Sequence, residues 1–224
     1  MRTSKWAIWA RRFGALALPL AVLPILLHRG RMIPSETFET IEAVALGIAA
    51  IAFVAGTVAI VRLWFTGDQG WGKAAFGFVF GAACLAPAAY LALEAMRLPA
   101  TLDVSTDFAN PPALVNFVPA RFMGAVERAR IEAAFPNARS RTYPVAAGDM
   151  FGLVEQLFVE RGWDIRTKRT PLNALDTGQL NAIATTLLGW QQEVVARVAG
   201  SAAGSTVAMR SASLTSFHDF AENG

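Results

Sequence analysis

Cysteine and histidine are almost absent from this chain of 224 residues, which has one cysteine, Cys84, and two histidines, His28 and His218. A single cysteine excludes a disulfide within the chain, and a structural zinc site needs about four ligands. The histidines lie far apart in the sequence, so histidine-based metal binding is not expected. No feature of the sequence implies a cofactor.

Charged residues are missing from three long apolar runs, Phe13–Leu27, Ala43–Val61 and Ala74–Leu93. A helix rises about 1.5 Å per residue and a bilayer core is about 30 Å thick, so the second and third runs are long enough to span. The first run is short, but its flanking arginines can reach the headgroups. We predict transmembrane helices at about 13–28, 42–64 and 74–94. Without ionisable groups in the runs, no proton or ion pathway is predicted.

The first run has a second interpretation, as a cleaved signal peptide. Pro19 and Pro24 lie inside it, and the sequence from His28 to Arg31 contains no small-x-small cleavage site. We therefore expect the run to stay in the protein as an anchor.

Lysine and arginine favour the cytoplasmic side of short loops. A cytoplasmic N-terminus places six positive charges inside (Arg2, Lys5, Arg11, Arg12, Arg62, Lys73) and three outside (Arg29, Arg31, Arg97). Three crossings then put residues 98–224 on the outer face. The sequence therefore predicts a multi-pass protein of the bacterial inner membrane with a periplasmic C-terminal domain.

Gly77 and Gly81 in the third run have the small-xxx-small spacing that lets helices approach closely. We predict that they pack against a neighbouring helix, either of this chain or of another subunit. Membrane lipids and other membrane-protein subunits are the expected partners.

Nucleic acid is not an expected partner, because the formal net charge is only +3. The arginines between Arg121 and Arg141 are interrupted by Glu127 and Glu132, which is typical of a solvated helix face.

The second half predicts an α+β domain at 98–224. An extended connector runs to about Asn116, and a helix stripe covers about Pro119–Ala134. A second amphipathic helix is predicted from an Asp149 cap to Gly162, with one face made by Met150, Leu153, Val154, Leu157 and Phe158. Strands are predicted around Trp163–Arg166, Gln179–Leu187, Glu193–Ala199 and Ser205–Leu214, the last two joined by the turn-prone residues 200–204. One face of the resulting antiparallel sheet should pack on the second helix.

The order of several motifs resembles a known family. The segment Asp103-Val-Ser-Thr-Asp107-Phe-Ala-Asn110-Pro111-Pro112 opens the domain, and Tyr143-Pro144, Gly162-Trp163 and Val194-Val-Ala-Arg197 follow. Arg210-Ser211-Ala-Ser213 and His218-Asp219-Phe-Ala-Glu-Asn223 close it. Over about residues 100–224 this order is similar to the bacterial and plastid family called domain of unknown function 1499. The resemblance implies no activity, since none is established for that family.

Three features depart from the family pattern. Asn181 stands where the family often has an acidic residue, and Gln192-Glu193 stand where it often has paired aspartates. Family members continue into a final helix where this sequence stops at Gly224, so the helix is lost or the sequence is incomplete. A lost helix would leave an apolar sheet surface.

Two clusters of polar residues were considered as sites. Asp103, Asp107 and Asn110 can bind a cation or act as acid and base, but such residues before prolines more often make turns. Ser211, His218 and Asp219 suggest a hydrolase, but adjacent His and Asp side chains diverge and no nucleophile elbow is present. We expect Arg210 instead to pair with Asp219 or Asp107, locking the last strand to the start of the domain. No catalytic constellation is predicted.

The function predicted first is a non-catalytic accessory or stabilising subunit of an inner-membrane complex. The alternative is a membrane-anchored module that holds a lipid or another hydrophobic ligand between the sheet and the Asp149–Arg161 helix.

Overall fold

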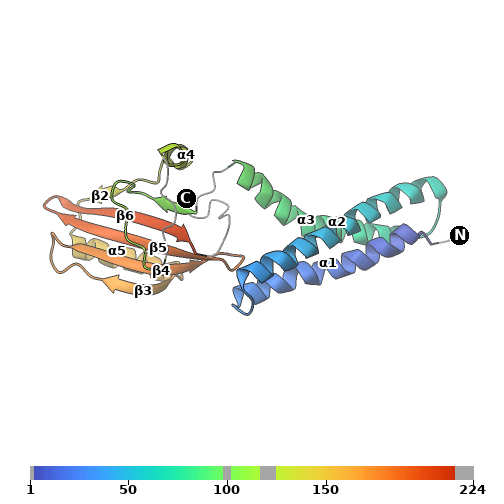
Figure 1. Cartoon of the computed structure of the whole chain (residues 1–224), viewed down its shortest axis with the longest axis horizontal. Coiled ribbons are helices and arrows are strands. Elements are labelled where there is room, and N and C mark those ends of the chain that lie inside the picture. Colours follow the sequence, from blue (N-terminus) through green and yellow to red (C-terminus); the bar gives the residue numbers. More distant parts are fainter. Residues whose placement is uncertain (1–2, 98–101, 117–124, 215–224) are drawn as a thin grey trace. The chain divides into compact units, whose positions relative to one another are not determined.

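The computed structural model describes residues 3–97, 102–116 and 125–214, and the chain divides into two compact units, Met1–Glu94 and Ala95–Gly224 (Figure 1). His218, Asp219 and Asn223, and the first part of the helix expected from Pro119, lie outside the described residues.

The first unit consists of three long apolar helices: α1 (Lys5–Arg29), α2 (Ser35–Thr66) and α3 (Trp71–Arg97). Each is long and apolar enough to cross a membrane, as the three uncharged runs predicted. The helices extend beyond those runs into charged flanks. At 1.5 Å per residue, the 32 residues of α2 measure about 48 Å, more than a bilayer core.

Small residues form the interior of this unit and large apolar residues point outward. Alanines such as Ala10, Ala49 and Ala59 are fully buried, whereas Leu26 and Val54 are 60% and 56% exposed. A water-soluble helical bundle has the opposite arrangement, with large aliphatic residues inside. Interfaces of small residues are typical of helices that pack within lipid.

Gly77 and Gly81 lie where α3 meets the other two helices of the same chain. A Cβ atom on Gly77 would stand 2.5 Å from the carbonyl carbon and oxygen of Ala10 in α1. On Gly81 it would stand 2.7 Å from the backbone nitrogen of Phe53 in α2. The two glycines therefore serve close helix packing inside this chain.

Replacement of Gly77 by alanine should separate α3 from α1, because the new methyl group overlaps the Ala10 backbone. We expect Gly77→Ala to lower the free energy of unfolding by about 1–3 kcal/mol, as overpacking does. Gly72→Ala is the matched control on the same helix, since nothing lies within 4 Å of that position. Thermal unfolding of the two variants in detergent makes the comparison; equal midpoints would contradict this packing.

The second unit is an antiparallel six-stranded sheet with helix α5 on one face, which confirms the α+β prediction. In chain order its elements are β1 (Asp103–Ser105), α4 (Ala125–Ala134), β2 (Arg141–Tyr143), α5 (Ala147–Glu160), β3 (Asp164–Arg169), β4 (Thr177–Thr185), β5 (Gln191–Ser201) and β6 (Gly204–Ser213). The strand order is β1-β6-β5-β4-β3, and β2 pairs with the start of β6 (Figure 1).

Two strands and one turn differ from the sequence prediction. β1 and β2 have three residues each and fall in segments without strand periodicity. Strands β5 and β6 remain paired as far as Ser201 and Gly204, so the turn between them has two residues rather than five. Gly204 adopts a φ of +131°, which favours glycine and lets the hairpin pair to its end.

Helix α5 begins two residues before the predicted cap, so Asp149 lies in its first turn and caps nothing. The predicted end is right: Gly162 has a φ of +68°, and Trp163 N–H donates to the Phe158 carbonyl. The predicted buried face was wrong at Leu153 and Leu157, which are 55% and 41% exposed. Phe151 is buried in their place, because a stripe through two phenylalanines removes more apolar area from water.

The core of this unit lies between α5 and the sheet. Phe151, Val154 and Phe158 pack on alternate residues of β4 and β5, which confirms the predicted contact between helix and sheet. The strand residues in this core are Leu180, Ala182, Ala184, Val194, Ala196 and Val198. The intervening residues of these strands therefore face the other side of the sheet.

Candidate functional site

The sheet face opposite α5 carries a polar cluster. The side chains come from β4 (Gln179, Asn181), β5 (Glu193, Arg197) and β6 (Arg210), and the strand register places them on one face. They bind residues 102–116, here called the leading segment, which includes β1 and precedes the rest of the sheet in the chain. Helix α5 thus packs on one face of the sheet through apolar contacts, and the leading segment is held to the other face by hydrogen bonds.

Glu193 is the centre of the cluster. Its side chain is 1% exposed, and its two carboxylate oxygens accept the backbone N–H groups of Val115 and Asn116 at 2.6 and 2.7 Å. The Asn181 amide donates to the same carboxylate at 3.0 Å and to the Ala113 carbonyl at 3.1 Å. Charge-assisted bonds of this kind offset much of the cost of burying a carboxylate.

Arg210 holds the start of the leading segment. Its guanidinium makes two bonds to Asp103, at 2.8 and 2.6 Å, and a third to the Pro112 carbonyl at 3.2 Å. The bonds to Asp103 raise the pKa of Arg210, the negative charges of Asp103 and Glu193 add to this, and burial opposes it. The guanidinium therefore stays charged and neutralised by Asp103.

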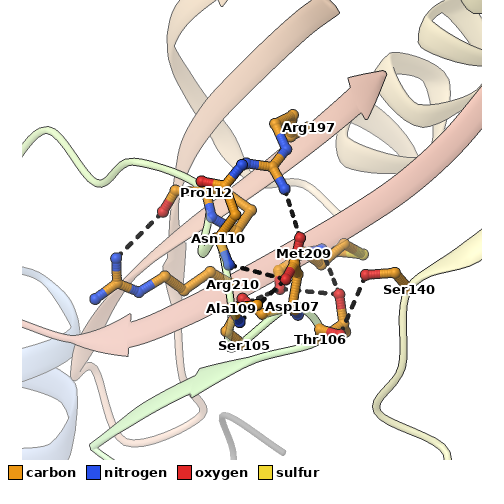
Figure 2. A network of polar contacts seen from close by, with 10 residues as sticks. All are labelled: Ser105, Thr106, Asp107, Ala109, Asn110, Pro112, Ser140, Arg197, Met209 and Arg210. Atoms are coloured by element: carbon orange, nitrogen blue, oxygen red, sulfur yellow. Dashed lines mark hydrogen bonds and ion pairs between the residues drawn. The ribbon is translucent and has the colours of Figure 1, made fainter. Parts of the chain in front are cut away.

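Arg210 pairs with Asp103 and not with Asp107, which was one of its two predicted partners. β1 pairs Ser105 with Arg210 and Asp103 with Ala212, so Asp103 lies beside the guanidinium. Asp107 comes after the strand and pairs with Arg197 at 2.8 Å (Figure 2). The other predicted partner, Asp219, lies outside the described residues.

Asp107 and Asn110 shape a turn. One oxygen of Asp107 accepts the backbone N–H groups of Ala109 and Asn110 at 3.2 and 3.0 Å, and the other faces Arg197 (Figure 2). Pro111 follows on the surface, and Pro112 is buried with its carbonyl turned to Arg210. Asp103 is thus bound to Arg210, and Asp107 is bound to Arg197 and to two backbone N–H groups. Among the described residues, no group of three His, Cys, Asp or Glu side chains is arranged to hold a metal ion.

Replacing Glu193 by glutamine should release the leading segment, because an amide cannot accept both backbone N–H groups. We expect Glu193→Gln to lower the free energy of unfolding by about 1–3 kcal/mol, as for a buried donor left unpaired. Denaturant unfolding gives the magnitude, and hydrogen exchange at the Val115 and Asn116 amides locates it. Glu155→Gln is the control: its surface pair with Lys168 should contribute about 1 kcal/mol at most. Unchanged exchange at both amides in Glu193→Gln would contradict the role of Glu193 in holding the leading segment.

The other candidate site is an apolar pocket of about 520 Å³ on the α5 side of the sheet. Its floor is formed by Ala184, Val194 and Met209 on three adjacent strands, with Val104 and Trp163 beside them. Trp163 is fixed by an edge-to-face contact with Phe158, with ring centres 4.8 Å apart. Polar residues line it where β4 ends and β5 begins, namely Thr185, Thr186 and Gln192, and Ser211 of β6 lies beside them. The remaining lining residues are Thr106, Ala138 and Arg210.

The sequence prediction placed such a pocket between the sheet and the second helix, whereas this pocket lies beyond the end of that helix. No residue of α5 lines the pocket, because the helix packs directly on the sheet and ends before this region. Ser211 was singled out in the sequence and lines the pocket, whereas Ser213 N–H bonds to the Leu102 carbonyl at 2.8 Å. Alternation places Ala184 and Val194 on the α5 face, but no sequence signal shows where that face is uncovered.

Comparison of the sequence with models of protein families, with curated proteins and with solved structures finds no match. The resemblance to the domain of unknown function 1499 family therefore stays a prediction.

Proposed function

We propose that the chain is a membrane-anchored module that binds a lipid or another hydrophobic ligand in the pocket of its α+β domain. The pocket of about 520 Å³ with an apolar floor carries the proposal, since pockets of about 300–1,000 Å³ suit small ligands. The described carboxylates near the sheet are held in ion pairs or backbone bonds, which favours binding over acid–base chemistry.

Anchoring in the membrane is supported by the packing of the three helices. Small residues fill their interior and large aliphatic side chains face outward along their length. Exposed apolar surface on this scale is unfavourable in water and matches a lipid environment.

The orientation proposed is a cytoplasmic N-terminus and a periplasmic domain in the bacterial inner membrane. The start of α1, the end of α2 and the start of α3 lie at one end of the unit, where Ser4 N–H bonds to the Gln69 carbonyl. That end gathers positive charges and tryptophans, namely Lys5, Arg11, Arg12, Arg62, Lys73, Trp6, Trp9, Trp64 and Trp71. Such an end is typical of the cytoplasmic interface.

Reporter fusions check this orientation. Alkaline phosphatase joined after Gly224 should be active, and green fluorescent protein at the same place should be dark, because three crossings export the C-terminus. Both reporters should reverse when joined after Gly67 in the loop between α2 and α3. An inactive phosphatase and bright fluorescence at Gly224 would contradict the orientation.

The lining defines what the pocket can recognise. Its hydroxyl and amide groups are neutral, and the guanidinium of Arg210 lies on the opposite face of the sheet, where it is neutralised by Asp103. A slender apolar chain with a hydrogen-bonding head therefore fits better than an ion that needs a free countercharge.

Filling the pocket should abolish binding. We expect Ala184→Phe and Ser211→Phe to weaken binding of the apolar probe N-phenyl-1-naphthylamine at least tenfold, because each ring occupies the ligand's volume. Ala203→Phe, on the exposed turn between β5 and β6, is the control and should bind as the parent does. Probe fluorescence with the full chain in detergent gives the affinities, and mass spectrometry of extracted lipids identifies a natural ligand. Equal probe binding by all variants would refute the pocket as the site.

The accessory-subunit function was predicted partly from Gly77 and Gly81, and both contact helices of this chain. The outward leucines of α5, Leu153 and Leu157, are the surface on which a partner subunit would lie. A protein that co-purifies in mild detergent and is released by Leu153→Ser would favour that function over ligand binding.

A further inference from the structure

The loop between β4 and β5, residues Thr186–Trp190, has the composition of a membrane-contacting element. It contains Leu187, Leu188 and Trp190, and no charged residue occurs between Asp176 and Glu193. The Leu187 side chain is 75% exposed. An exposed leucine without nearby charge favours the boundary between lipid headgroups and acyl chains, whereas the indole nitrogen of Trp190 is buried in the protein.

We propose that this loop rests in the surface of the bilayer that holds the three helices and lets a lipid pass from that bilayer into the pocket. The inference rests on the proposed membrane anchor and ligand-binding function, and adds the route by which the ligand arrives.

The chain enters the sheet from α3 at the same end that carries this loop. Leu102 accepts the Ser213 N–H at 2.8 Å, and Leu214 N–H donates to the Gln191 carbonyl at 2.9 Å, so the chain joins the sheet at the strand ends that carry the loop. Five residue steps separate Leu102 from Arg97, the last residue of α3. Fully extended, they span about 17 Å at most. The opposite end of β6 is nine further steps away, or about 30 Å.

The loop is held in one conformation that turns Leu187 outward. Thr186 N–H donates to the Trp190 carbonyl at 2.9 Å, and Trp190 N–H donates to the Thr186 hydroxyl at 3.1 Å. Gly189 has a φ of +98°, which closes the turn at a position where a side chain would strain it. An exposed leucine on a fixed turn inserts into lipid without first losing much conformational freedom.

The pocket adjoins the loop on both sides. Thr185 and Thr186 line it directly before Leu187, and Gln192 lines it two residues after Trp190. An acyl chain that leaves the bilayer beside Leu187 would therefore reach the apolar floor at Ala184 and Val194 with little exposure to water.

The opposite end of the sheet supplies a matched control residue. Leu172, between β3 and β4, is 91% exposed, more than Leu187. Its turn is fixed too, since Leu172 N–H bonds to Asp176 at 2.9 Å, but Arg169 and Asp176 make its surroundings charged. Exposure alone predicts equal lipid contact for both leucines, whereas the proposal predicts contact only for Leu187.

The test places an environment-sensitive label at each position of the full chain. Leu187→Cys and Leu172→Cys, each with Cys84→Ala, are labelled with nitrobenzoxadiazole and reconstituted in vesicles of phosphatidylethanolamine and phosphatidylglycerol. Spin-labelled lipid carrying 5-doxyl chains should quench the label at 187 several-fold more than at 172, with a blue-shifted emission. Equal quenching at the two sites, or none at 187, would overturn the proposal.

A second measurement separates this loop from the pocket itself. Leu187→Glu should slow transfer of a fluorescent fatty acid from vesicles to the reconstituted protein at least fivefold, yet bind N-phenyl-1-naphthylamine in detergent as the parent does. Unchanged transfer would contradict the route through the loop. If the parent binds no probe while the label at 187 is still quenched, ligand binding is refuted and the membrane contact of the loop stands.

Discussion

The buried carboxylate of Glu193 is the constraint on which the domain's attachment depends. A carboxylate removed from water costs several kcal/mol unless its oxygens are satisfied, and here backbone N–H groups of Val115 and Asn116 satisfy them. The leading segment therefore cannot leave the sheet without exposing two donors and orphaning one buried charge. Arg210 and Asp103 repeat this logic nearer the start of the domain. Polar side chains bind the backbone of this segment, whereas α5 is held to the sheet by apolar packing.

The pocket follows from a mismatch of lengths. The 14 residues of α5 extend about 21 Å, whereas the 11 residues of β5 extend about 36 Å. A single helix of this length cannot cover the whole sheet face, and Gly162 ends it before the strands end. The uncovered part holds small side chains such as Ala184, together with Val104 and Met209, so its floor is apolar and hollow. The polar contacts to the leading segment do not occupy this region, because they lie on the opposite face and the two faces use alternate residues of the same strands.

Elements with a strong local signal could be predicted from the sequence. The uncharged runs gave three helices, and alternation gave four of the strands, because each pattern reports burial directly. β1 and β2 were missed, since a three-residue strand is stabilised by its partner β6 and not by its own sequence. Arg210 was expected to lock the last strand to the start of the domain, but its partner depends on strand register. Register places Asp103, and not Asp107, beside the guanidinium. The face of α5 was predicted correctly at Met150, Val154 and Phe158, but Phe151 is buried in place of Leu153 and Leu157, because the sheet beneath the helix makes that choice.

The two units differ in how their interiors are packed. The helix unit is packed through buried alanines and glycines that bring the helix backbones close together in the part described here. The sheet unit contains the pocket, whose lining consists of neutral polar groups and an apolar floor. This lining favours an apolar molecule over a charged, water-soluble one. The ligand proposed for this lining is apolar, and such a molecule partitions from water into a bilayer. The leading segment enters the sheet at the strand ends that border the pocket, because the Leu102 carbonyl accepts the Ser213 N–H. The pocket and the entry of the leading segment thus lie at the same end of the sheet, and the proposed binding of a membrane lipid uses this arrangement.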